Sequence, residues 1–421
     1  MQDNKSTGFQ IEESKRQSWI SLAAVWTGAM VCVPCLMIGG LLSSGFTLGP
    51  MSVLIVIGYA IICAFMCFIG MQGCDTGLPT VSLAESALGK KGAQFLISLI
   101  LAIACIGWFG VQAAVCGSSF SSMIAQMTGV EIPVAVSSLI WGAVMLLTAV
   151  FGYNTVKYLN YIAVPALIIV LIWALIAAIF QNDGIAKLGA HTPPAPMSFV
   201  SGINFVVATF AVGGVISADF SRYARNRKDV IKSTVLGVLP SGLVVLFIGA
   251  TCSIVAGQYD ISQVFSALGL PAIGLIGLIL ATWTTNVTNA YSGGIAVTNL
   301  LGFGENKFKT TTAIAGAAGT ILGAVGIMDK FQSFLSIITS FVPPVAGVMI
   351  AAYWIVGKGK RENFAVAGGV NVAGILSFVL GAAVAYITAN VVPFFIAPIN
   401  GIVVSMAAYV ILIRFLPAKT A

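Results

Sequence analysis

Apolar runs of about 20 residues recur along the whole chain, and they limit its fold more than any other feature. A helix of that length crosses the hydrocarbon core of a bilayer. Only 8% of the residues are charged and 58% are hydrophobic, whereas a soluble domain carries about 25% charged residues. We therefore expect an all-α integral membrane protein. Its twelve spanning helices are predicted at residues 19–43, 50–71, 92–126, 132–152, 156–180, 198–219, 231–256, 266–299, 310–327, 331–356, 364–389 and 392–415.

The basic residues are distributed unevenly among the predicted loops. If the N-terminus is cytoplasmic, eighteen of the twenty Lys and Arg residues fall in cytoplasmic segments, and only Lys187 and Lys330 fall outside. Cytoplasmic loops of membrane proteins collect Lys and Arg, so this asymmetry supports an even number of spans. We expect a multi-pass protein of the cell (plasma or inner) membrane. Its tail at 1–18 and its C-terminus are predicted to be cytoplasmic, and no nucleic-acid partner is needed to explain the net charge of +7.

Two of the predicted spans are interrupted near the middle. The first contains Gly28 and Pro34, and the sixth contains Gly213-Gly214. Pro cannot donate a backbone hydrogen bond, and Gly is the poorest helix former after Pro. In lipid, freed backbone groups must find partners, usually around a cavity or a bound ion. Interrupted helices in corresponding positions of two chain halves therefore predict the central site of a transporter.

The order of these features predicts an internal repeat. The first and sixth spans are interrupted, and the third and eighth are long, so each set of five helices matches the other. The sixth span begins on the opposite side of the membrane from the first, so the repeats would be inverted. This 5+5 arrangement resembles the leucine-transporter fold. The expected division is a first repeat at 19–180, a second repeat at 198–356 and two further helices at 364–415.

The predicted spans lack the groups that several function classes need. All thirteen Asp and Glu residues lie in loops or near predicted span ends, and the single histidine, His191, lies in an external loop. Proton-coupled transporters place Asp, Glu or His within the bilayer. An enzyme needs a base, a nucleophile with a partner or a metal cluster. We expect neither a side-chain proton relay nor an enzyme, no cofactor, and a substrate that is neutral or weakly charged.

The third span offers a candidate binding face. Trp108 and Gln112 are four residues apart and project from one side of a helix. An aromatic ring can stack on a flat heterocycle, and a side-chain amide can bond the donors and acceptors along its edge. The same spacing also fits a tryptophan at the membrane interface and a glutamine that bonds a neighbouring helix.

Two further spans carry candidate residues. Phe210 lies about one turn before the predicted break of the sixth span. In the eighth span, Ala281, Thr284 and Thr285 share a helical face whose carbonyl and hydroxyl oxygens suit sodium, while Asn286 and Asn289 share a neighbouring face that could bond a substrate. The alternative is that Phe210 packs and that the Thr and Asn side chains hold helices together by hydrogen bonds.

Cys32 and Cys35 have the spacing of a redox or metal pair. They lie within the first span, with no second pair and no nearby histidine. From the sequence we expect these two cysteines to serve core packing.

Three motifs resemble one known family. They are Gly-Trp-Phe-Gly at 107–110, Ser-Ala-Asp-Phe-Ser-Arg-Tyr-Ala-Arg-Asn at 217–226 and Trp-Thr-Thr-Asn at 283–286. In this order and spacing they resemble the nucleobase:cation symporter-1 family, and within it the bacterial cytosine and purine permease branch. The resemblance extends over nearly the whole chain. It implies a secondary active symporter that imports a nucleobase or related heterocycle, such as cytosine or a purine, with sodium as the coupling ion.

The resemblance also implies roles for single residues. Trp108 would stack on one face of the ring and Phe210 on the other, and Gln112 would bond its edge. Further substrate contacts would come from the backbone around Phe210, Ala211 and Gly213 and from Asn286 or Asn289. Sodium would be held by the carbonyls of Gly28, Val31 and Ala281 and by the hydroxyls of Thr284 and Thr285.

One position departs from the family pattern. Typical cytosine permeases carry a Gln three residues before the Trp of the third span, and here that residue is Cys105. A purine, uracil, hydroxymethylpyrimidine, allantoin or hydantoin therefore stays open beside cytosine, as do protons in place of sodium. The rival functions are a neutral amino-acid transporter on the same fold, a channel and a membrane enzyme.

Overall fold

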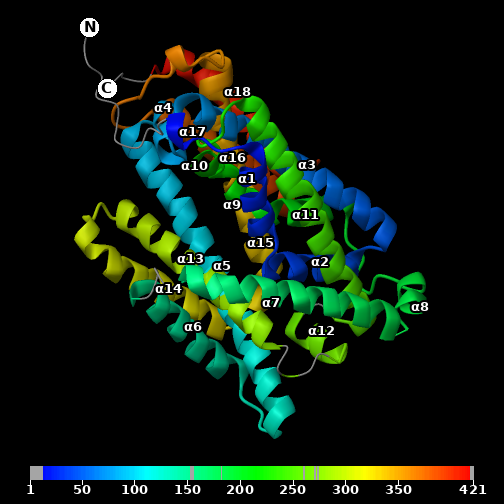
Figure 1. The fold of residues 1–421 in the computed structure, drawn as a ribbon. Coiled ribbons are helices and arrows are strands. Elements are labelled where there is room, and N and C mark those ends of the chain that lie inside the picture. The colour runs from blue at the N-terminus through cyan, green and yellow to red at the C-terminus, as the bar shows by residue number, and fades with distance from the viewer. Residues whose placement is uncertain are drawn as a thin grey trace.

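The chain is almost entirely helical (Figure 1). The computed structural model describes residues 13–151, 156–181, 183–258, 261–269, 272 and 275–417. The first helices are α1 Trp19–Met30, α2 Val33–Gly45, α3 Leu48–Thr76, α4 Thr80–Leu88, α5 Lys90–Thr128, α6 Val134–Phe151, α7 Val156–Ile176 and α8 Gly184–Gly189. The later ones are α9 Phe199–Val215, α10 Ala218–Ser221, α11 Arg227–Ala256, α12 Ile261–Ala267, α13 Leu275–Leu300, α14 Phe308–Ala324, α15 Phe331–Phe341, α16 Pro343–Ile350, α17 Val372–Asn390 and α18 Ala397–Phe415. A π-helical turn, Ala351–Val356, continues α16.

The helices agree with the predicted membrane class. In the described part of the chain, seven helical stretches are long and apolar enough to span a membrane, and the bent pair α1 and α2 makes eight. The other four predicted spans contain α7, α9, α13 and α14, which are not among these eight. The count of twelve spans and the division into inverted repeats therefore stay predictions.

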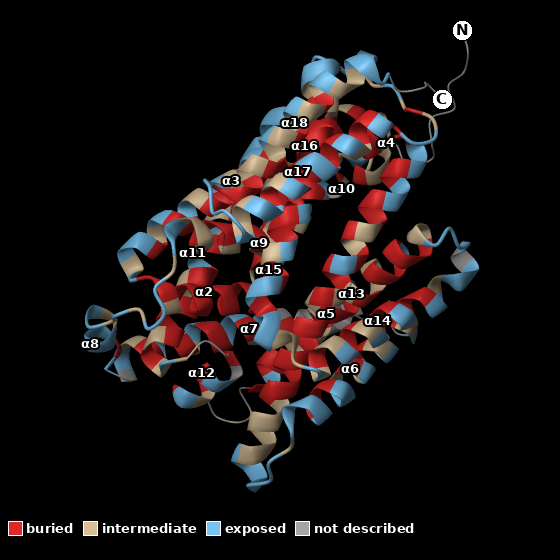
Figure 2. Ribbon diagram, turned by 180° about the vertical axis from the view of Figure 1, so that it is seen from behind, coloured by how far each residue is buried: buried red, intermediate tan, exposed pale blue. Residues whose placement is uncertain are grey.

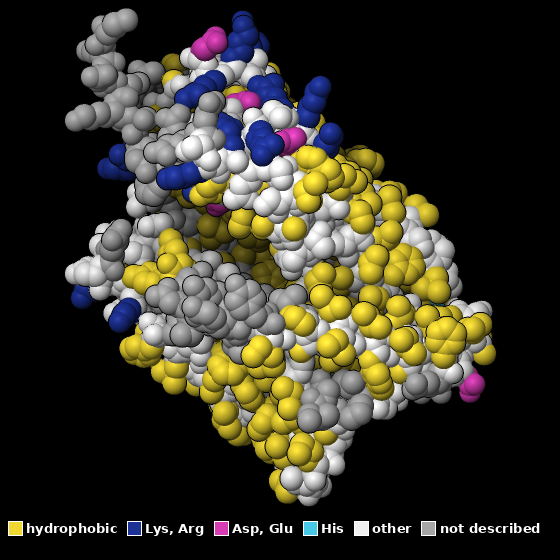
Figure 3. Space-filling view, viewed as in Figure 1, with side chains coloured by type: hydrophobic (Ala, Val, Ile, Leu, Met, Phe, Trp, Pro, Cys, Tyr) yellow, Lys and Arg dark blue, Asp and Glu magenta, His cyan; other side chains and the backbone are white. Residues whose placement is uncertain are grey.

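The described chain ends lie at the same end of the molecule. The Arg16 guanidinium donates to the carbonyl oxygens of Cys74 at 3.2 Å and Ala224 at 2.6 Å. Cys74 lies in the last turn of α3, and Pro417 lines a pocket together with Ser86 of the following α4. Figure 3 shows Lys and Arg side chains gathered at this end. The clustering agrees with the uneven charge distribution of the sequence.

The second helix, α2, lies at the centre of the fold. Every residue of α2 except Ser44 is buried, and the helix contacts α3, α5, α9, α11, α12 and α13. In Figure 2, buried residues colour α2, whereas exposed residues are frequent on α6 and α8. A helix that is apolar on all sides is one that other elements surround. The joint that precedes α2 is therefore held inside the protein.

Candidate functional site

The break in the first span lies between the two residues that the sequence suggested. Helix α1 ends at Met30 and α2 begins at Val33, with an angle of 59° between them. Val31 and Cys32 form the joint, and Cys32 is extended, with φ −142° and ψ 155°. Gly28 lies inside α1, and Pro34 lies in the first turn of α2, where its missing N–H costs nothing. The prediction of a broken span is confirmed, and the break falls within the predicted stretch from Gly28 to Pro34.

The joint frees the Gly28 carbonyl from its helical partner. In a continuous helix, the Gly28 carbonyl would accept from the amide of Cys32. That amide instead donates to the Met30 carbonyl oxygen at 3.0 Å. Gly28 is exposed and Val31 is half-buried. This part of the backbone can therefore offer oxygen atoms to a ligand.

The break in the sixth span lies at Phe210, not at Gly213-Gly214 as the sequence predicted. Phe210 has the non-helical angles φ −137° and ψ 16°, while both glycines lie inside α9. A Cβ on Gly213 would lie 2.6 Å from the Phe210 ring, and one on Gly214 would lie 2.2 Å from the Phe65 ring. The glycines therefore make room for aromatic rings. Tertiary packing, and not the local helix propensity of glycine, decides where this helix bends.

The two predicted stacking residues have different aromatic partners. The half-buried Trp108 ring on α5 contacts the Phe334 ring of α15 edge to face, with centroids 5.1 Å apart. The Phe210 ring contacts the Trp26 ring of α1 at 6.1 Å. Among the ring contacts of the described residues, none joins Trp108 directly to Phe210.

Sequence reasoning missed Phe334 and Trp26. Trp26 is 2% exposed, and its indole N–H has no hydrogen-bond partner. Its only sequence signal is its place about one turn before the interrupted segment. Phe334 carries no local signal, because only packing of α15 on α5 brings its ring to Trp108.

Gln112 is the most unusual polar residue of this region. Its side chain is 2% exposed, and its Oε1 oxygen has no hydrogen-bond partner. A buried acceptor without a partner costs about 1–3 kcal/mol. Gln112 lies one turn from Trp108 on α5, so an unpaired acceptor and an aromatic ring share one side of the helix. A ligand that donates a hydrogen bond would satisfy this oxygen.

The two asparagines of α13 form a chain of hydrogen bonds to α5. The Asn286 amide donates to the Phe109 carbonyl oxygen at 3.0 Å, and the Asn289 amide donates to Asn286 Oδ1 at 3.3 Å. Asn286 is fully buried and Asn289 is half-buried. In this structure Asn286 joins two helices, which was the alternative role that the sequence left open. Asn289 is the one that lies nearer to the surface.

The threonine face of α13 gathers oxygen atoms around one carbonyl. The hydroxyls of Thr284 and Thr285 both donate to the Ala281 carbonyl oxygen, at 3.2 and 2.9 Å. Thr284 and Ala281 are buried, while Thr285 is half-buried. Hydroxyl and carbonyl oxygens are the ligands that hard cations such as sodium prefer. Helix α13 also contacts α2, which follows the joint at Val31 and Cys32.

The surface is hollowed on one side of this region. Figure 3 shows a recess below the basic end, with hydrophobic side chains inside, where Figure 1 places α1, α9 and α13. Gly28 of α1 and Thr288 of α13 are exposed. Both elements that carry the predicted ion ligands therefore include a residue that solvent reaches.

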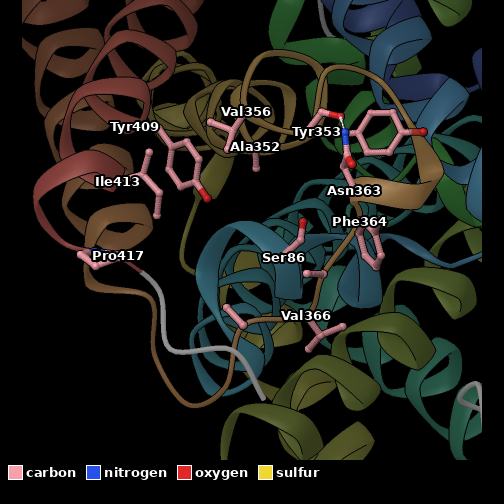
Figure 4. Close-up of a pocket in the computed structure, with 13 residues that line it drawn as sticks. Ser86, Ala352, Tyr353, Val356, Asn363, Phe364, Val366, Tyr409, Ile413 and Pro417 are labelled. Atoms are coloured by element: carbon pink, nitrogen blue, oxygen red, sulfur yellow. Dashed lines mark hydrogen bonds between the residues drawn. The ribbon is translucent and has the colours of Figure 1, made fainter. Parts of the chain in front are cut away.

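A separate pocket of about 260 Å³ lies near the basic end (Figure 4). Tyr409 and Ile413 of α18 lie on one side of it, and Ser86 of α4 and Phe364 lie on the other. None of the predicted substrate or sodium residues lines this pocket. It is therefore distinct from the predicted site.

Comparison with known proteins agrees with the motifs. The model of the family described as "Permease for cytosine/purines, uracil, thiamine, allantoin" matches residues 10–412. The cytosine permease of Escherichia coli K12 is 31% identical over 424 residues, which cover 100% of this chain and 96% of that protein. The hydantoin permease of Microbacterium maritypicum is 24% identical over 360 residues, covering 80% of this chain and 73% of that protein.

Solved structures show the same fold. The inward-facing conformation of Mhp1 matches with a TM-score of 0.83 at 20% identity, covering 99% of this chain and 95% of Mhp1. A closed conformation of Mhp1, a nucleobase-cation-symport-1 family transporter with bromovinylhydantoin bound, matches with a TM-score of 0.76 at 19% identity, covering 98% of this chain and 95% of that one. The family expected from the motifs is confirmed. The chain belongs to the nucleobase-cation-symport-1 family of permeases for cytosine, purines, uracil, thiamine and allantoin, and it is a multi-pass membrane transporter and not an enzyme.

Proposed function

We propose that this permease is a symporter that imports a nucleobase or a related planar heterocycle by alternating access, with sodium as the coupling ion. The observation that carries the proposal is the Gln112 Oε1 oxygen, which is buried without a partner one turn from Trp108. Nucleobases and hydantoins carry ring N–H groups beside a flat ring. Such a ligand would donate to Gln112 while its face lies on Trp108.

The aromatic residues support a ring-shaped substrate. Trp108 is half-buried, and its ring already makes edge-to-face contact with Phe334. Phe210 lies at the break of α9, where backbone groups of Phe210, Ala211 and Gly213 would bond the ring's edge. Stacking on an aromatic side chain is worth about 1–3 kcal/mol per base. The printed names of the relatives, a cytosine permease and a hydantoin permease, agree with a small polar heterocycle.

The sodium part of the proposal rests on oxygen chemistry. Ala281, Thr284 and Thr285 supply one carbonyl and two hydroxyl oxygens on α13. The joint after α1 supplies the Gly28 and Val31 carbonyls, of which the first has lost its helical partner. Sodium would bridge the two elements, and by thermodynamic linkage sodium and substrate would raise each other's affinity by the same factor. The basic end of the molecule, where the described chain ends at residues 13 and 417 lie, would face the cytoplasm.

Thermal stabilisation of the purified full chain tests both halves of the proposal. The panel contains cytosine, uracil, purines, hydroxymethylpyrimidine, hydantoin, allantoin and neutral amino acids, each in sodium and in choline buffer. A ligand at 100 times its Kd stabilises the folded state by about 2.7 kcal/mol. A shift with one heterocycle that grows in sodium is the expected result.

Other outcomes reject defined parts of the proposal. A heterocycle that stabilises equally in both buffers would remove sodium as the coupling ion. Stabilisation by an amino acid alone would reject the heterocycle. Trp108→Ala should abolish the response to the heterocycle, whereas Trp141→Ala, which removes an aromatic from the Phe120 and Trp283 cluster, should retain it.

A further inference from the structure

The two cysteines of the first span lie at its break. Cys32 is the extended residue just before α2, and Cys35 lies in the first turn of that helix. Their sulfur atoms are 3.3 Å apart. Both are free thiols. The Cys-Val-Pro-Cys sequence alone indicated packing, but the structure brings the two thiols into direct contact at the point where the span bends by 59°.

This contact sets the pair apart from the other cysteines. All eight cysteines are described, and the remaining six are buried. The nearest comparable pair is Cys63 and Cys67, one turn apart on α3, where the Cys63 thiol donates to the Thr234 carbonyl oxygen at 3.9 Å. Cys32 and Cys35 are the pair whose sulfurs touch, so this pair needs the least movement to form a covalent bridge.

One cysteine of the pair is partly exposed as a residue, and the other is buried. Cys32 is half-buried, beside the half-buried Val31 and close to the exposed Gly28. Cys35 is 2% exposed. A partly exposed cysteine in contact with a buried one matches the pairing of an attacking thiol with a resolving thiol.

We propose that Cys32 and Cys35 form a reversible dithiol–disulfide site that small hydroperoxides oxidise. The Cys32 sulfur attacks the outer oxygen of the hydroperoxide, which breaks the O–O bond, releases an alcohol and leaves a sulfenic acid. The Cys35 sulfur then attacks the Cys32 sulfur and displaces water. The two thiols together lose two electrons and two protons, and the hydroperoxide takes these up and is reduced to an alcohol and water. Exchange with an added dithiol restores both thiols.

The bridge would act on the joint between α1 and α2. The disulfide would link Cys32 to Cys35 and close a small covalent ring that includes residues 32–35. The backbone of Cys32 would then be fixed relative to the first turn of α2. The first span lies beside the proposed substrate and sodium residues, so a locked joint would stop movements that alternating access requires. This effect on uptake rests on the proposed function, whereas formation of the bridge does not.

Peptide mass mapping of the purified full chain tests the bridge without any substrate. After treatment with tert-butyl hydroperoxide, a disulfide between residues 32 and 35 should appear and should disappear with dithiothreitol. Cys35→Ser should instead accumulate a sulfenic acid at Cys32 that dimedone traps, and Cys32→Ser should give neither product. Cys63→Ser and Cys67→Ser should still form the bridge.

The outcomes separate this inference from the proposed function. Absence of the 32–35 bridge in the folded protein, or equal oxidation of Cys63 and Cys67, would overturn the site. If the bridge forms, the oxidant should reduce uptake and dithiothreitol should restore it. Uptake by the serine variants, which cannot form the bridge, should not change with the oxidant. A bridge that leaves uptake unchanged would overturn its role at the joint. A protein that transports no heterocycle before oxidation would reject the proposed function, while mass mapping would still decide the bridge.

Discussion

Gln112→Leu should stabilise the ligand-free protein while weakening its response to substrate. The substitution removes a side-chain oxygen that is buried without a partner and keeps a side chain of similar size. An unpaired buried acceptor costs about 1–3 kcal/mol, and replacement by an apolar group recovers part of that cost. We expect a gain within this range in the free energy of unfolding, and hence a higher midpoint of thermal unfolding.

The same substitution should weaken binding by a modest factor. A neutral hydrogen bond contributes about 0.5–1.5 kcal/mol, which corresponds to roughly a two- to twelvefold change in Kd. Thermal unfolding followed by tryptophan fluorescence, with and without the stabilising heterocycle, measures both effects on one sample. The midpoint without ligand should rise, and the shift caused by ligand should shrink.

Gln72→Leu is the matched control. Gln72 is also 2% exposed, but its amide donates to the Met349 carbonyl oxygen at 3.5 Å. Its removal should cost about 0.6 kcal/mol, the mean for interhelical side-chain hydrogen bonds in membranes, and should leave the ligand response unchanged. A lower midpoint for Gln112→Leu with an undiminished ligand response would refute the reasoning, because Gln112 would then be a structural residue.

Three further perturbations test other parts of the structure. Thr285→Ala should raise the sodium concentration needed for substrate uptake, and unchanged sodium dependence would remove Thr285 from the ion site. Gly107→Ala should cost about 1–3 kcal/mol of stability by overpacking, because its Cβ would lie 2.2 Å from the Phe334 ring; a variant with wild-type thermal stability would contradict this. Burial raises the pKa of the Glu85 carboxyl in the folded protein, and Lys90 opposes the rise. Ionisation of Glu85 therefore destabilises the fold as pH increases through the pKa of the folded state. Glu85→Gln should therefore raise the unfolding midpoint at neutral pH and lose this advantage below the ordinary pKa of glutamate, and an advantage that persists in acid would exclude ionisation as its cause.

The apolar runs predicted the structural class, and the motifs predicted the family. Both kinds of feature can be recognised within a short stretch of sequence. Run length and apolar composition depend on the solvent around each segment, so they predicted a helical membrane protein before any contact was known. Gly-Trp-Phe-Gly, Trp-Thr-Thr-Asn and the segment at 217–226 identified the family. The presence of two broken helices was also predicted correctly from the sequence.

The position of the second break and the partners of the site residues were not predictable from the sequence and became visible only in the packed structure. Gly213-Gly214 looked like the break, yet these residues make room for the Phe210 and Phe65 rings, and the bend falls at Phe210. Likewise, Asn286 looked available to a substrate, yet its amide bonds the Phe109 carbonyl of α5.

No local pattern distinguishes a paired amide from an unpaired one, because the partner lies on another helix far away in the chain. The sequence placed Gln112 on the same helical face as Trp108. Only the packed helices left its oxygen without a partner. The sequence determined which chemical groups this permease carries, and the packing determined which of them are already bonded and which are free for a ligand.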